Sequence, residues 1–95
     1  MRDPRYAKLA GVLVNYSVAV KKGDLVEIAG GAVAEPLLSE IYREVLRVGG
    51  HPFLRVSLPG MAETFYRTAK QHQLKYISPV AKFETDHVDK FISIW

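Results

Sequence analysis

The sequence contains no cysteine, so it can form no disulfide framework, thiolate zinc site or cysteine nucleophile. That absence is compatible with a reducing compartment, and we expect a cytoplasmic protein. The sequence also lacks any uninterrupted apolar run approaching about 18 residues, and its first residues, Met1–Tyr6, are charged rather than apolar. We therefore expect neither a membrane span nor a signal peptide.

A large excess of charge of one sign is missing as well. Thirteen Lys and Arg face ten Asp and Glu, giving a net charge of +3. The basic residues are scattered among acidic ones, whereas a nucleic-acid groove would gather them around stacking aromatic side chains. These scattered residues are Lys21, Lys22, Arg43, Arg47, Arg67, Lys70 and Lys75. We interpret them as solvated helix faces and expect no nucleic-acid partner.

What the chain does have is enough apolar material for one folded unit. Its 95 residues are 48% hydrophobic and 24% charged, which is typical of one globular domain over residues 1–95 and excludes a two-domain enzyme. A chain of this length is expected to bury roughly 60–65% of its unfolded surface, so its stability is marginal without further contacts. Partner contacts are therefore plausible on size alone.

The spacing of apolar residues predicts helices alternating with strands. Asp3 before Pro4 is a helix-start signal, and Gly49-Gly50 fits a helix end. The expected helices cover Pro4–Val20, Pro36–Val48, Met61–His72 and Val80–His87. The expected strands cover Leu25–Ala29, Phe53–Leu58 and Val88–Trp95, with Gly30-Gly31 ending the first strand and Leu74–Pro79 forming a loop or a helix end.

Strands separated by helix-sized segments predict parallel pairing through right-handed crossovers. The expected class is therefore α/β, with a small, mostly parallel three-stranded sheet and helices on both of its faces. Three strands do not fix their own order, so the order stays open.

The glycines after the first strand are candidates for a phosphate-binding turn. The letters from Gly30 to Ala34 match neither G-x-G-x-x-G nor a P-loop, and no acidic residue closes the second strand to bind a ribose. We expect a plain turn here. The alternative that stays open is a small binding module for a nucleotide or phosphorylated ligand, with a site lined by Gly30, Gly31, Gly60 and Ser57.

Metal-ligating side chains gather near the carboxyl-terminal end. Glu84, Asp86, His87 and Asp89 lie within six positions, but their spacing matches no recognised metal motif. We expect a helix end with solvated carboxylates, one of which caps the backbone.

Other candidate catalytic side chains also lack a matching motif. His51 and His72 are expected to be structural, and neither Ser17 nor Ser57 lies in a G-x-S-x-G elbow. The sequence therefore predicts no catalytic, cofactor-binding or metal-ligating residue in this segment.

An ordered set of short matches over nearly the whole chain resembles the thermophilic metallo-aminopeptidases, the aminopeptidase T group. The matching residues are Tyr6-x-x-Leu9, Leu13-Val14-x-Tyr16-Ser17, Lys22-Gly23-Asp24, Ala34-Glu35-Pro36-Leu37, Tyr42-Arg43-Glu44, Gly49-Gly50-His51-Pro52, Phe65-Tyr66, Ala69, Gln73-Leu74 and Asp89-x-x-Ile92-x-Ile94. No single piece is diagnostic, but the order of the whole set is specific.

The resemblance implies enzymes that remove amino-terminal residues from peptides with two divalent metal ions, zinc, cobalt or similar. It also implies that the ligands, Glu, His, Tyr and Asp residues, lie in the carboxyl-terminal part of a longer chain, so none carries over to a position here. We expect an amino-terminal domain or fragment, inactive alone, that serves as a scaffold for substrate access and for assembly with the carboxyl-terminal catalytic region.

A self-associating interaction domain is a further alternative. The expected strand Val88–Trp95 places large apolar side chains on a short segment, namely Phe91, Ile92, Ile94 and Trp95. If that strand lies at a sheet edge, a second copy could pair with it. We therefore expect a homo-oligomer, such as a dimer.

Overall fold

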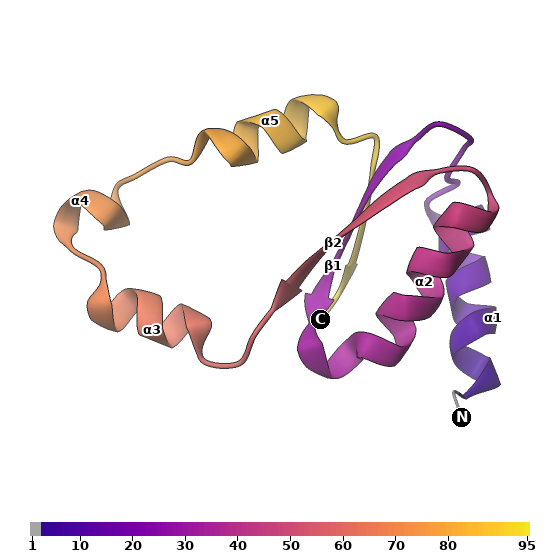
Figure 1. The fold of residues 1–95 in the computed structure, drawn as a ribbon, viewed down its shortest axis with the longest axis horizontal. Helices are drawn as coiled ribbons and strands as arrows, with labels where there is room; N and C mark the ends of the chain where they lie inside the picture. Colours follow the sequence, from indigo (N-terminus) through magenta and orange to yellow (C-terminus); the bar gives the residue numbers. More distant parts are fainter. Residues whose placement is uncertain (1–2) are drawn as a thin grey trace.

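Three parallel strands form the centre of the computed structural model, which describes residues 3–95. They are β1 (Leu25–Gly31), β2 (His51–Ser57) and β3 (Lys90–Ile94), in the order β2-β1-β3 (Figure 1). The α/β class and the parallel pairing are confirmed, and the order left open by the sequence places β1 in the middle. Met1 and Arg2, on which the expectation of no signal peptide partly rests, lie outside the described residues.

The first helix begins where the sequence predicts. The Asp3 side chain accepts a hydrogen bond from the Arg5 backbone N–H at 2.9 Å and caps α1 (Pro4–Val12). The helix then widens into a π-helical segment, η1 (Leu13–Ser17), and ends before the expected Val20. The chain turns there because it buries the Val20 side chain, and Ala19 adopts a left-handed conformation with φ of 55°.

One face of the sheet is covered by α2 (Glu35–Arg47), which follows a short 3₁₀ turn, η2 (Ala32–Ala34). The helix packs on β1 and β2, and α1 packs beside it (Figure 1). This covered side, which we call face A, carries Val26, Ile28 and Ile92. The buried core consists of Ala10, Val14, Val20, Val26, Ile28, Leu38, Ile41, Val45 and Ile92.

The glycine pair after Ala29 belongs to the strand, and the predicted turn is wrong. Gly30 pairs with Val56 on one side and with Ile94 on the other. A Cβ on Gly30 would lie 2.6 Å from the carbonyl oxygen of Ile94, so any larger residue there would force the neighbouring backbone to shift. Close packing, not a turn, explains this residue.

Between β2 and β3 the chain makes a wide excursion, residues 58–89, which we call the arch (Figure 1). It contains α3 (Met61–Thr68), α4 (Gln71–Leu74) and α5 (Pro79–His87). The single helix expected over Met61–His72 breaks at Ala69, whose ψ of 142° is extended. None of the three helices buries a residue, so within residues 3–95 packed helical cover is present on face A alone.

The open arch leaves the molecule with unusually little buried surface. Its accessible surface is 7032 Å² and its radius of gyration 15.5 Å. A compact protein of this mass and length would have about 5500 Å² and about 12.4 Å. The chain buries about 55% of its unfolded surface, less than the 60–65% expected from its length. Within residues 3–95, no helix has the length and apolar character needed to cross a bilayer.

Candidate functional site

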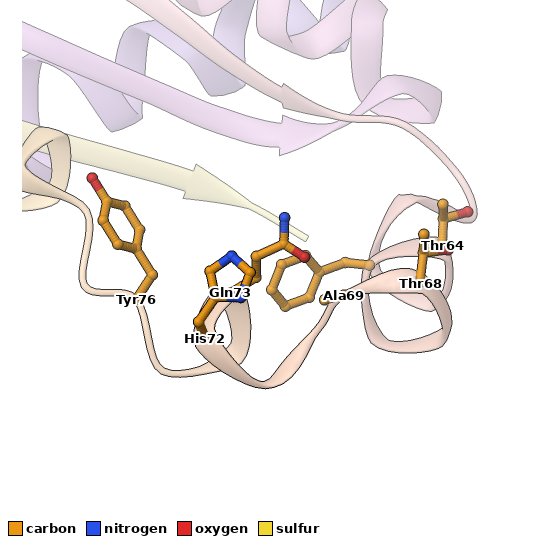
Figure 2. A pocket seen from close by; sticks show the side chains of 7 residues that line it. Thr64, Thr68, Ala69, His72, Gln73 and Tyr76 are labelled. Atoms are coloured by element: carbon orange, nitrogen blue, oxygen red, sulfur yellow. The ribbon is translucent and has the colours of Figure 1, made fainter.

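An apolar depression lies on the inner side of the arch, where α3 and α4 meet at an angle. It has a volume of about 470 Å³, and we call it the arch groove. In Figure 2 the side chains of His72, Gln73 and Tyr76 point to the inside of the arch, toward the sheet. Its lining residues are Thr64, Phe65, Thr68, Ala69, His72, Gln73 and Tyr76.

Local hydrogen bonds set the angle between α3 and α4. Gly60, with φ of 83°, permits the sharp entry into α3. After the break at Ala69, the Gln73 side chain accepts from the Lys70 backbone N–H at 2.8 Å, and the Gln73 N–H donates to the Lys70 carbonyl at 2.9 Å. This reciprocal pair starts α4 in a new direction and so shapes the groove.

The uncovered side of the sheet, face B, carries Glu27, Phe53, Arg55, Phe91 and Ser93, which the strand register places in neighbouring rows. Arg55 Nε donates to Glu27 Oε1 at 3.3 Å, and its guanidinium also donates to the Glu84 carboxylate of α5. We call this group the Arg55 bridge. Glu27 is only 9% exposed, and a buried carboxylate needs such a cation.

Sequence reasoning missed the Arg55 bridge. The available signal was Glu27, a single acid inside the apolar run Leu25–Ala29. An acid in a central strand needs a basic partner, but the sequence alone does not identify which Arg or Lys supplies it.

The four candidate metal ligands of α5 and its end are engaged separately. Asp86 pairs with Lys82 Nζ at 2.9 Å, and Asp89 accepts from the Leu25 backbone N–H at 2.8 Å. His87 stacks on Phe83 with ring centroids 4.0 Å apart, while Glu84 belongs to the Arg55 bridge. In the described part of the chain, no three His, Asp or Glu side chains converge as metal ligands would. These residues do not fit a two-metal centre.

The four residues of the alternative nucleotide site are only partly brought together. Ser57 and Gly60 line an open depression of about 650 Å³ at the end of β2, and Gly31 pairs with Ser57 in the sheet. Gly30 is enclosed by Leu38 and Ile94 and cannot approach a ligand.

Of the other candidates, His72 lines the arch groove, whereas His51 and Ser17 are exposed at the start of β2 and the end of η1.

A partly buried side chain with a shifted pKa lies away from the arch groove. The pKa of Glu44 on α2 is lowered, chiefly because the Arg47 guanidinium hydrogen-bonds its carboxylate. Asn15 Nδ2 also donates to Glu44, at 2.7 Å, and so ties η1 to α2. This group is structural, because it faces neither the groove nor face B.

Comparison with models of known protein families finds a match. The model of the family described as thermophilic metalloprotease (M29) matches residues 2–95, nearly the entire chain. A search of curated proteins finds no match.

Proposed function

Because this chain belongs to the thermophilic metalloprotease (M29) family, we propose that it is a non-catalytic amino-terminal segment of a metal-dependent aminopeptidase. In this proposal the segment is a scaffold that contributes to substrate access and to assembly, while residues outside it bind the two divalent ions. The observation that carries the proposal is the combination of a family match over residues 2–95 with the dispersal of the candidate ligands in residues 3–95.

The chemistry of the proposed reaction supports this division. Hydrolysis of a peptide bond near neutral pH needs an activated water or nucleophile, and a metal centre that activates water needs several converging ligands. The described His, Asp and Glu side chains converge in no such group. In the Arg55 bridge, the Glu27 and Glu84 carboxylates instead pair with the Arg55 guanidinium.

The test is an activity assay on the purified 95-residue chain. The chain is incubated with zinc, cobalt or manganese and an aminoacyl chromogenic substrate, beside a chain of the same composition in scrambled order. We expect no metal-dependent turnover above the scrambled control. Turnover that depends on metal and exceeds the control would show that the segment is itself the enzyme.

The partners follow from the same proposal. The main partner is the carboxyl-terminal catalytic region of the same enzyme. The proposed location is the cytoplasm, which suits a composition without cysteine. Self-association stays a prediction, favoured by the exposure of Phe91 (50%) and Trp95 (79%) on and beside β3. Light scattering over a concentration series measures it.

A further inference from the structure

A right-handed connection from β2 to β3 must cross face B. The first crossover runs from β1 to β2 through α2 on face A, and the second runs in the reverse direction, from β2 past β1 to β3. Right-handed crossovers in opposite directions lie on opposite faces of a sheet. The Arg55 bridge agrees, because it joins α5 to the face-B side chains Arg55 and Glu27.

The arch lies where a layer of helices would ordinarily cover face B, but α3 and α4 do not pack on the sheet. Its two ends are held, at β2 by the chain itself and at β3 by the bond from the Asp89 backbone N–H to the Leu25 carbonyl at 2.9 Å. The Arg55 bridge holds α5 in between. The helices α3 and α4, which lie at the far side of the arch from the sheet in Figure 1, bury no residue. A parallel sheet is normally covered by helices on both faces, so a layer is missing between arch and sheet.

Both sides of that space carry apolar side chains, and the Arg55 bridge also lies on face B. On face B, Phe53 and Phe91 lie on either side of Glu27 in the strand register. On the arch side, no Lys, Arg, Asp or Glu lines the groove, and Phe65 is 46% exposed. Whatever lies there presents an apolar side, which disfavours a phosphate or a nucleic acid.

The size of the uncovered surface indicates the kind of partner. The chain exposes about 1500 Å² more than a compact protein of its mass, which matches the upper range of interfaces between domains of one chain. An α-helix, about 10 Å across, is the element that ordinarily fills one layer against a parallel sheet.

We propose that the arch groove and face B together form a docking cradle for one α-helix with an apolar side, supplied by the carboxyl-terminal region of the same enzyme. The proposal rests on the proposed function, and it assigns the surface through which the scaffold receives the catalytic region. The Arg55 bridge ties α5 to the sheet and so fixes one side of the cradle.

The test compares the intact native gene product that contains these residues with the 95-residue chain. Backbone amides of α3 and α4 should exchange at least about tenfold more slowly in the intact protein, because the docked helix protects them. Phe65→Ala should lower the thermal midpoint of the intact protein by about 2 °C or more and leave that of the 95-residue chain unchanged. Tyr16→Ala removes an aromatic ring that is 82% exposed on η1, and as the matched control it should change neither midpoint.

Each other outcome overturns the proposal in a distinguishable way. A longer native product whose α3 and α4 amides stay unprotected removes the cradle but leaves the proposed function intact. Protection that appears in the 95-residue chain as its concentration rises would make a second copy the occupant. Equal destabilisation of both proteins by Phe65→Ala would make the groove part of the chain's own core. A native product that ends at Trp95 removes the docking partner and the proposed function together.

Discussion

At the scale of single residues, Glu44 shows how one carboxylate joins two elements. Its Oε1 accepts from Arg47 Nε at 2.8 Å, and its Oε2 accepts from Asn15 Nδ2 at 2.7 Å. The Glu44 side chain is 17% exposed, so water screens these bonds only in part. The bonds favour the ionised form and lower the pKa of Glu44.

Glu44→Gln should lower the free energy of unfolding by about 1 kcal/mol at pH 7. Because the folded-state pKa is lowered, this stabilisation is present above the unfolded value of about 4.3 and is lost as the pH falls through the folded value. The difference between variant and parent should therefore shrink in acid. Urea unfolding at several pH values measures it, and Glu40→Gln on the same helix is the control. A difference that persists undiminished at pH 2 contradicts this account.

At the scale of elements, two glycines have opposite roles. Gly30 lies where the Ile94 carbonyl leaves no room for a Cβ, whereas a Cβ on Gly11 in α1 would meet no atom within 4 Å. The first glycine permits the close approach of β3 to β1. The second only weakens a helix.

Gly30→Ala should lower the free energy of unfolding by about 1–3 kcal/mol, because Ile94 on β3 must shift to admit the methyl group. Gly11→Ala should raise it by about 0.5–1 kcal/mol, because alanine favours the helix. Chemical denaturation of both variants beside the parent checks the pair. Equal effects of the same sign would show that backbone propensity, not crowding by β3, decides both positions.

Local signals in the sequence predicted the elements whose ends depend on near neighbours. Asp3-Pro4 placed the start of α1, and the apolar spacing from Leu37 to Leu46 placed α2. The predictions from sequence are wrong where contacts with residues distant in the chain determine the local structure. Gly30 is fixed by Ile94, 64 positions away, and the end of η1 by the burial of Val20 in the core.

The candidate site was less predictable than the fold. The arch groove depends on the break at Ala69, a residue that favours helix and gives no local sign of an extended backbone. The Arg55 bridge joins residues 28 and 29 positions apart on three elements, so their meeting follows from strand order, which the sequence left open.

At the scale of the whole molecule, the structure divides into a packed body and an open arch. The body, formed by α1, η1, α2, the sheet and the loop that carries Val20, contains the buried core of the described residues. The arch contributes no buried residue from its three helices. The two parts should therefore differ in local stability.

Limited trypsin digestion of the 95-residue chain should cut first in the arch, after Arg67, Lys70 or Lys75, and only later in α2 after Arg43 or Arg47. The nicked halves should stay together, because Ile92 of β3, 4% exposed, is part of the core. Mass spectrometry after gel filtration identifies the cuts and the association. Early cleavage within α2, or separation of the halves after a single cut, would show that the division is wrong.

The position of β3 beside β1 has a consequence for biosynthesis. The contact between Leu25 and Asp89 closes a loop of 64 positions, so the ribosome must complete the arch before the third strand can join. Until then the nascent chain holds only β1 and β2 with the helices before them, and one edge of β1 is open to wrong pairing. Chaperone contacts during synthesis should therefore concentrate on that edge and cease once β3 emerges.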